Sequence, residues 1–313
     1  MFKNLLGYQQ TAQYFSYSGY NIAYWQVSTP SPTGVRVEPH LLSPSAEPIV
    51  FLHGFPSASL DWSKVWNLLS NSQNNDGYGD FHAIDFLGFG LSDKPHPHRY
   101  TLQEQADIIV TYLHRQGIRQ CHIVAHDYGV SVAQELLARQ TLEHNDNFSI
   151  TSMMFLNGGL FAELHRPILT QKLLHSSLGP WLAKCMSKRS LTKGFNKIFG
   201  QSTPPETLVL DELWALLKHA EGTRVIPSLL GYLDERKQYR NRWVRAMQST
   251  PVPLGFINGV QDPISGQHML DAFTKLLPSA YTKALDVGHY PQLEDPNSVY
   301  LALKEFWRMS DTQ

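Results

Sequence analysis

The sequence predicts an α/β protein in which a mostly parallel, twisted sheet with helices on both faces carries an inserted helical cap. Short apolar runs alternate with helical patterns from residue 49 to residue 156, and the alternation resumes after residue 253. Between residues 160 and 250 the pattern is helical, with breaks at prolines and no convincing strand. We therefore expect a first core part (1–159), a cap (160–250) and a second core part (251–313). Because sites in α/β proteins lie at the carboxyl ends of the strands, we expect the cap to cover that edge.

The first core part begins with a predicted β-hairpin and continues with alternating strands and helices. Two aromatic-rich runs flank Ser18-Gly19 and predict the hairpin over residues 14–27. Thr101 and Glu104 have the spacing of a capping box and predict a helix start. Continuous apolar runs predict buried strands, with helices and polar loops between them. The strands are expected at 49–52, 82–85, 122–126 and 150–156, the helices at 61–70 and 101–117, and the loops at 30–48 and 74–77. The second core part is expected to contain strands at 253–257 and 281–287 and helices at 268–277 and 298–308.

The stretch 122–137 contains a strand that runs directly into a helix. Its first half is an apolar run and its second half has helical spacing, so no loop fits between them. Two small residues, Ala125 and Gly129, stand two places on either side of Asp127. This pattern is typical of a nucleophile elbow and places Asp127 at its apex. The N-terminus of the helix favours an ionised carboxylate there.

Two other interpretations of this stretch compete with the elbow. Asp127 could simply cap the helix that starts at Tyr128, since Asp is a preferred N-cap residue. The run Gly129-Val130-Ser131-Val132-Ala133 resembles a serine elbow displaced by four residues. That serine elbow would extend the strand beyond the end of the apolar run, and we reject it.

Two further polar residues follow predicted strands in the second core part. Asp262 lies in the stretch Asn258 to Pro263, and His289 lies in the stretch Val287 to Pro291. Taken alone, one histidine among 14 is more often structural than catalytic, and Asp262-Pro263 could be an ordinary turn. The order nucleophile, acid, histidine, each after its own strand, matches the α/β-hydrolase triad and favours a catalytic role.

The composition argues against several classes of function. The 313 residues include 42% hydrophobic and 17% charged residues, which is an ordinary globular composition. Lys and Arg number 26 against 27 Asp and Glu, so no broad field attracts nucleic acid or an anionic membrane. Two cysteines without metal or disulfide spacing suit a reducing cytoplasm, and the N-terminus lacks the apolar run of a signal peptide or membrane span. We expect a cytoplasmic protein without nucleic-acid or membrane partners, and the sequence does not specify its oligomeric state.

Several stretches spread over nearly the whole chain carry a resemblance to a known family. They are His53-Gly54-Phe55-Pro56, Asp85 to Pro95, His126-Asp127-Tyr128-Gly129 with Val132 to Leu137, Asn157-Gly158-Gly159, His165-Arg166-Pro167 and His289 to Pro296. In these stretches the chain resembles α/β-hydrolases with an aspartate nucleophile, the epoxide hydrolase and haloalkane dehalogenase group. Within that group it resembles the mesoderm-specific transcript proteins. The resemblance implies the α/β-hydrolase fold.

The resemblance also implies roles for particular residues. Asp127 would be the nucleophile, His289 the base and Asp262 the acid that orients it, with the backbone N–H groups of Phe55 and Tyr128 as the oxyanion hole. No metal or organic cofactor is implied.

Two details limit what the resemblance transfers. Some dehalogenases carry the acid after the strand that precedes the cap, where this chain has Asn157, so Asp262 is the expected acid. The nearest spare carboxylate, Glu163, is more naturally a cap residue. Mesoderm-specific transcript proteins carry an N-terminal hydrophobic segment that this sequence lacks, so membrane association is not expected.

A carboxylate nucleophile favours alkyl over acyl substrates. Its attack on an ester or amide would give an anhydride, whereas its attack on a saturated carbon gives an ordinary ester. Water deprotonated by His289 would then hydrolyse that ester. We expect a hydrolase that acts on a small apolar organic substrate.

The leaving group separates two enzymatic hypotheses. Dehalogenases hold a halide with N–H donors from a Trp after the nucleophile and from a Trp or Asn elsewhere, and these positions here are Tyr128 and Phe55. Epoxide hydrolases supply an acid from two cap tyrosines, or from a Tyr and a His. The cap offers Tyr232 and Tyr239 in its later part, and His165 and His175 in its earlier part. We expect an epoxide hydrolase with Tyr232 as proton donor, with a haloalkane dehalogenase as the alternative; plain helix packing is the competing role for Tyr232.

Two further interpretations concern the cap and the function as a whole. The basic residues Arg236, Lys237, Arg240, Arg242 and Arg245 could bind an acidic ligand, but Asp234 and Glu235 beside them favour a solvated helix face. A non-catalytic small-molecule binding protein is the third hypothesis, because a fold does not fix a function. The intact triad argues against it.

Overall fold

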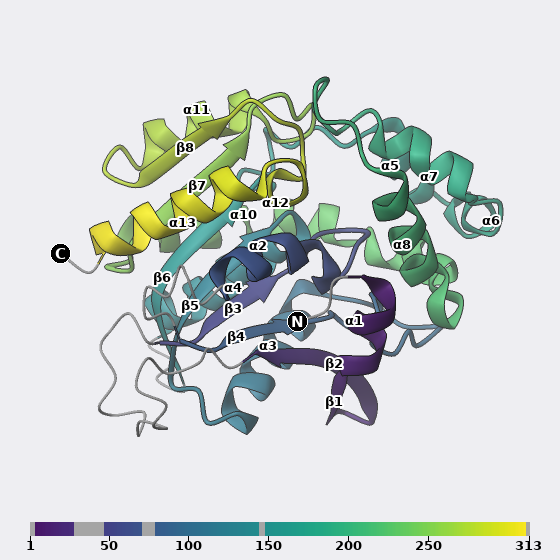
Figure 1. Ribbon diagram of the computed structural model, residues 1–313, viewed down its shortest axis with the longest axis horizontal. Coiled ribbons are helices and arrows are strands. Elements are labelled where there is room, and N and C mark those ends of the chain that lie inside the picture. Colours follow the sequence, from purple (N-terminus) through teal and green to yellow (C-terminus); the bar gives the residue numbers. More distant parts are fainter. Residues whose placement is uncertain (1–3, 28–46, 71–78, 144–147, 311–313) are drawn as a thin grey trace.

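Eight strands form one sheet in the computed structural model, which describes residues 4–27, 47–70, 79–143 and 148–310 (Figure 1). Their order is β1-β2-β4-β3-β5-β6-β7-β8; β2 is antiparallel to both β1 and β4, and the other neighbours are parallel. The strands are β1 (Gln13–Tyr17), β2 (Tyr20–Val27), β3 (Ile49–Leu52), β4 (Phe81–Ile84), β5 (Gln120–His126), β6 (Ser149–Leu156), β7 (Leu254–Gly259) and β8 (Tyr281–Leu285). The mostly parallel sheet predicted from the sequence is confirmed.

Each face of the sheet has its own apolar core, because successive strand residues point to opposite faces. In β3, Val50 and Leu52 belong to one core, and Ile49 and Phe51 belong to the other. The first core is covered by α3 (Leu102–Arg115), α4 (Tyr128–Glu143) and α11 (Gln267–Leu276). The second is covered by α1 (Leu5–Thr11), α2 (Ser63–Leu69) and α13 (Pro296–Ser310). Burial on both faces explains why the parallel strands are continuous apolar runs.

The helices between β6 and β7 form an insertion, which we define as residues 160–250. They are α5 (Leu169–Leu174), α6 (Gly179–Lys184), α7 (Lys188–Phe195), α8 (Thr207–Lys218), α9 (Ile226–Leu229) and α10 (Tyr232–Ser249), with a 3₁₀ helix at His219–Val225. Pro180 and Pro227 lie in the first turns of α6 and α9, where proline is tolerated. The last helix, α10, packs along α4, and Trp243 Nε1 donates to Glu135 there (2.8 Å). Figure 1 shows α5 to α8 to the right of the sheet, on the side away from the C-terminus.

Three local features differ from the sequence predictions or lie outside the described residues. Helix α1 was not predicted; its Tyr8 is buried, and the phenol donates to the buried carboxylate of Asp85 (2.6 Å). Only half of the predicted capping box forms, because Thr101 Oγ1 accepts from Glu104 N (3.1 Å) while the Glu104 carboxylate contacts His98 instead (2.9 Å). The predicted loop at 30–48 falls almost entirely outside the described residues, as does the whole turn at 74–77.

The described helices do not have the character of membrane spans. Within residues 4–27, 47–70, 79–143 and 148–310, no helix combines the length and the apolar character needed to cross a bilayer.

Candidate active site

Asp127 stands at a tight turn between β5 and α4. Its backbone has φ of 44°, in the left-handed region, as expected for a strand that turns directly into a helix. Gly129 lets this turn approach β3, because a Cβ atom there would lie 2.7 Å from the carbonyl oxygen of Leu52 and 2.8 Å from that of His53. The Asp127 carboxylate turns toward the loop after β3, where its Oδ2 accepts a hydrogen bond from Phe55 N (3.0 Å). Ser131, the residue of the rejected serine elbow, lies inside α4.

Arg236 of α10 brings a positive charge to Asp127. Its Nη2 donates to the Asp127 carbonyl oxygen (2.9 Å) and lies 3.5 Å from Oδ1, while its Nε donates to Ser131 Oγ (2.7 Å). Burial alone would raise the pKa of Asp127, but the charges of Arg236 and His289 outweigh burial and lower it. The nucleophile candidate is therefore ionised at neutral pH.

The interpretation of residues 236–245 as a solvated helix face is wrong for Arg236, which is buried. Three other cations of the run pair with nearby carboxylates. Lys237 pairs with Asp234, Arg240 with Glu163, and Arg242 with both Glu135 and Glu143. Helical periodicity is the signal in the sequence that points to Arg236. It lies four residues after Tyr232 and therefore on the same face of the helix.

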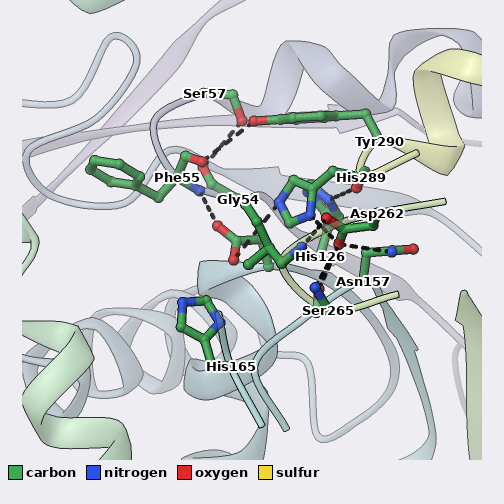
Figure 2. Close-up of polar contacts among 12 residues, drawn as sticks. Gly54, Phe55, Ser57, His126, Asn157, His165, Asp262, Ser265, His289 and Tyr290 are labelled. Carbon is green, nitrogen blue, oxygen red and sulfur yellow. Dashed lines mark hydrogen bonds and ion pairs between the residues drawn. The ribbon is translucent and has the colours of Figure 1, made fainter. Parts of the chain in front are cut away.

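His289 lies between the two carboxylates. Its Nδ1 is 2.7 Å from Asp262 Oδ2 and its Nε2 is 4.0 Å from Asp127 Oδ1, so only the Asp262 contact is short enough for a hydrogen bond (Figure 2). Burial alone would lower the pKa of His289, but the charge and hydrogen bond of Asp262 and the charge of Asp127 raise it to about 8. The imidazole thus carries a proton at neutral pH as long as Asp127 is ionised.

The Asp262 carboxylate is held by four further hydrogen bonds. Oδ1 accepts from Ile264 N (2.8 Å), and Oδ2 accepts from Ser265 N (3.0 Å), Ser265 Oγ (2.8 Å) and Asn157 Nδ2 (3.1 Å). Figure 2 shows Ser265 and Asn157 around this carboxylate. Burial opposes ionisation, but His289 and these donors lower the pKa of Asp262 to about 2. Asn157, at the position where some dehalogenases have the acid, therefore supports Asp262 as a hydrogen-bond donor.

Neighbouring residues fix the backbone around His289. His289 N donates to Ile198 O (2.7 Å), and His126 Nε2 contacts His289 O (2.7 Å). Burial and the charge of His289 lower the pKa of His126 to about 3, so its ring is neutral and Nε2 carries the proton for this bond. Sequence reasoning did not single out His126.

Glu294 joins the His289 loop to the insertion. Its Oε2 accepts from Gly288 N (2.8 Å), Gly200 N (2.7 Å) and Thr203 Oγ1 (2.5 Å), and its Oε1 accepts from Tyr290 N (2.9 Å). One carboxylate thus holds the N–H groups on both sides of His289 and a segment of the insertion. In the sequence, Glu294 stands out only as part of the family motif from His289 to Pro296.

Asp61 is a further buried carboxyl, and it lies behind the loop that contains Phe55. Its Oδ2 contacts Ser57 Oγ, which also lies 3.1 Å from Gly54 O. Burial raises the pKa of Asp61 to about 8, so the carboxyl is protonated at neutral pH. A protonated Asp61 can donate to Ser57 Oγ while that hydroxyl donates to Gly54 O.

Two of the four proton-donor candidates lie at Asp127. Tyr232 is buried; its ring lies against those of Phe55 (5.9 Å between centroids) and Tyr128 (5.2 Å), and burial together with the Asp127 charge raises its pKa. The ring of Tyr232 also lies under the Arg236 guanidinium (4.5 Å to the centroid). Its phenol oxygen accepts from Gln171 Nε2 (3.4 Å), which leaves the O–H free to donate.

His165 is the other candidate at the site. Its Nδ1 lies 3.3 Å from Arg236 Nη1, a donor, so Nδ1 must be unprotonated and Nε2 carries the hydrogen. Burial and the Arg236 charge lower the pKa of His165 to about 3, and the ring is neutral. The buried Nε2 has no hydrogen-bond partner within the described residues.

The remaining sequence candidates lie away from Asp127. His175 pairs with Asp234 at the surface, and the Tyr239 ring packs against Trp243. Glu163 is exposed and paired with Arg240. The N–H of Phe55 points at the Asp127 carboxylate, and Tyr128 begins α4 directly after Asp127.

The site is closed to solvent in this structure. Asp127, Asp262 and His289 are all buried. A cavity of about 530 Å³ lies between the insertion and the Asp262 loop and is lined by Asn196, Lys197, Phe199, Gly200, Gln201, Pro204, Gln261 and Pro263. Asp127 does not line this cavity. Over the described ranges, no group of three His, Cys, Asp or Glu side chains is arranged to hold a metal ion.

Several known proteins are similar to this chain in sequence or in fold. The model of the alpha/beta hydrolase family matches residues 49–303. The mesoderm-specific transcript protein of Mus musculus is 39% identical over 302 residues, covering 93% of this chain and 84% of that protein. The solved haloalkane dehalogenase DatA from Agrobacterium tumefaciens C58 is 18% identical with a TM-score of 0.74, covering 96% of both chains. Epoxide hydrolase CorEH is 17% identical with a TM-score of 0.72, covering 96% of this chain and 99% of its own.

At these low identities the two solved structures show the fold alone, and they confirm the α/β-hydrolase fold predicted from the sequence. The family match and the 39% identity extend over most of the chain. The chain therefore belongs to the alpha/beta hydrolase family.

Proposed function

We propose that the protein is an epoxide hydrolase that acts through a covalent ester on Asp127. One observation carries the proposal: an ionised carboxylate, not a hydroxyl, occupies the elbow and lies 4.0 Å from a histidine that is hydrogen-bonded to a second carboxylate. A carboxylate attacks saturated carbon productively, because the product is an ordinary ester. The phenol of Tyr232 and the Nε2–H of His165 add donors for a developing alkoxide.

In the first step Asp127 Oδ1 forms a bond to an epoxide carbon while the carbon–oxygen bond of the ring breaks. Oδ1 is the available oxygen because Oδ2 is held by Phe55 N. The alkoxide takes the proton of Tyr232, and the neutral His165 ring donates a hydrogen bond to the same oxygen. A neutral imidazole N–H can polarise an oxygen in this way without transferring its proton.

Esterification removes the Asp127 charge that helps to raise the pKa of His289, so the imidazole releases its proton to solvent and regains it when the carboxylate is restored. In the second step the neutral His289 takes a proton from water, and the hydroxide attacks Cγ of Asp127. The negative charge that develops on Oδ2 is stabilised by the N–H of Phe55 and, at the N-terminus of α4, by that of Tyr128. The bond between Cγ and the ester oxygen breaks, the departing diol oxygen takes the proton from His289, and the proton of the new carboxyl returns to Tyr232. The net reaction adds one water to one epoxide.

A haloalkane dehalogenase is the second candidate, and the Nε2–H of His165 favours it. Neither Phe55 nor Tyr128 has a side-chain N–H for a halide, whereas His165 offers one that is buried near Asp127. A single such donor is a weak halide site, and the phenol of Tyr232 suits an alkoxide better. A non-catalytic binding protein is the third candidate and predicts no turnover of either substrate class.

A paired screen separates these candidates. Terminal and aryl epoxides are tested against bromo- and iodoalkanes, with diol formation and halide release scored separately and the Asp127→Asn variant as the inactive control. We expect diol from at least one epoxide and little halide release. Halide release above diol formation favours the dehalogenase, and no turnover across the panel favours the binding protein.

The covalent step has its own test. In His289→Gln the ester on Asp127 should accumulate, because alkylation does not need the base but hydrolysis does. Intact-mass analysis after substrate addition should show protein plus one epoxide. Unmodified protein despite measured binding would contradict the ester mechanism.

A further inference from the structure

The outer end of the insertion exposes large apolar side chains. We call the set Leu169, Leu173, Leu178 and Trp181 the α5–α6 patch, whose members are 71%, 44%, 61% and 66% exposed. Leu169 and Leu173 are one helical turn apart on α5, and Leu178 and Trp181 lie one turn apart at the start of α6, which packs against α5. Figure 1 shows α5 and α6 at the end of the molecule opposite the C-terminus. A cluster of this kind marks an interaction site rather than ordinary surface.

The charge around the patch has one sign. Residues 164–205 contain seven Lys and Arg and no Asp or Glu. Because the whole chain has a net charge of −1, the rest of it carries −8. Six of the seven cations are exposed, namely Arg166, Lys172, Lys184, Arg189, Lys193 and Lys197.

Neighbouring elements cancel little of this charge. Asp211 pairs with Lys188, and Asp234 pairs with His175 and Lys237. Lys172 and Lys184, which flank the apolar side chains on α5 and α6, keep their charges at the surface. The near-zero net charge of the chain therefore hides a strongly basic segment at the patch.

We propose that the α5–α6 patch docks on an anionic lipid surface. Exposed Trp and Leu side chains enter the boundary between headgroups and acyl chains, and Lys side chains beside them bind anionic headgroups. A second copy of the chain fits less well, because two like-charged basic segments would face each other. The proposal departs from the expectation of no membrane partner, which rested in part on the net charge of the whole chain. It concerns binding alone and does not depend on the proposed reaction.

Co-sedimentation with vesicles tests the proposal. Vesicles of phosphatidylcholine containing about 30% phosphatidylserine should bind the protein, and pure phosphatidylcholine vesicles should bind it markedly less. Binding should weaken in high salt, because the screening length falls from about 8 Å at 0.15 M to about 3 Å at 1 M. Trp181 is the most exposed tryptophan described, so its emission should shift to shorter wavelength on binding.

Matched variants identify the surface. Leu178→Ser and Trp181→Ser should each weaken partitioning about ten-fold, and Lys172→Ala and Lys184→Ala about five-fold each. Leu301→Ser is the control, because Leu301 is also an exposed leucine (60%) but lies on α13. All five positions are exposed, and unchanged thermal midpoints should show that every variant is folded.

Three results would overturn the proposal. The first is no binding to the anionic vesicles, and the second is binding that Trp181→Ser leaves unchanged or that Leu301→Ser weakens equally. The third is concentration-dependent dimerisation that Trp181→Ser abolishes in a protein that does not bind vesicles, which would assign the patch to a second copy.

Discussion

Replacing Asp127 by Asn should lower the pKa of His289, because it removes a negative charge 4.0 Å from Nε2. At an effective dielectric constant of about 20, that charge contributes about 4 kcal/mol, or about three pKa units. This is an upper limit because Arg236 offsets part of the carboxylate charge. From the value of about 8 in the intact protein, we expect a fall of between about one and about three pKa units.

The assay is a pH titration of the imidazole signals by NMR of histidine-labelled protein, with His289→Gln identifying the His289 signals. Glu163→Gln is the matched control, because it neutralises an exposed carboxylate that is paired with Arg240. A His289 pKa that stays at about 8 in Asp127→Asn would refute the electrostatic coupling. If the coupling holds, alkylation of Asp127 during turnover has the same effect as the substitution, and it frees His289 to act as a base at neutral pH.

Other substitutions test the surroundings of Asp127 and the buried Asp61. Tyr232→Phe should slow ester formation from epoxides roughly 10²–10⁴-fold in single-turnover measurements with little change in stability, and an unimpaired enzyme would contradict the donor role. Arg236→Met should destabilise the fold by roughly 3–5 kcal/mol in urea unfolding, because it leaves the Asp127 carboxylate buried without its cation. Adding Asp127→Asn should recover most of this loss, and equal costs of Arg236→Met in both backgrounds would show that the charges are not coupled. Asp61 keeps its proton up to about pH 8 when folded but loses it near its usual pKa when unfolded, so stability should fall as pH rises between these values. Asp61→Asn should flatten this slope in thermal unfolding between pH 5 and pH 8, and an unchanged slope would disprove the assignment.

The strands and the elbow could be predicted because their signals are local. A run such as Ile49–Leu52 is apolar throughout only when both faces of a strand are covered, and Gly129 marks a close approach of backbone that no side chain would permit. The position of Asp127 at the turn could then be predicted, because the strand runs directly into the helix without a loop between them.

The residues that surround Asp127 depend on contacts that the local sequence does not contain. Arg236 belongs to a run whose neighbours pair at the surface, and only the packing of α10 on α4 buries it. His126 contacts the His289 backbone although it lies 163 residues earlier in the chain. Glu294 lies five residues after His289 and holds the backbone on both sides of it. Helix α1 likewise depends on a distant contact, because its buried Tyr8 donates to Asp85.

The carboxylate of Glu294 links the loop that carries His289 to residues 200–203 of the insertion. Substrate must pass a closed surface, and any movement of residues 198–203 away from the sheet breaks the bonds from Gly200 and Thr203 to Glu294 and the bond from His289 to Ile198. The same movement would therefore remove one of the bonds that hold the His289 backbone, while Glu294 keeps its bonds to Gly288 N and Tyr290 N. In the proposed reaction, an opening of the insertion on this side would therefore loosen the residue that activates water, and His289 would be fully held again only after the insertion has closed.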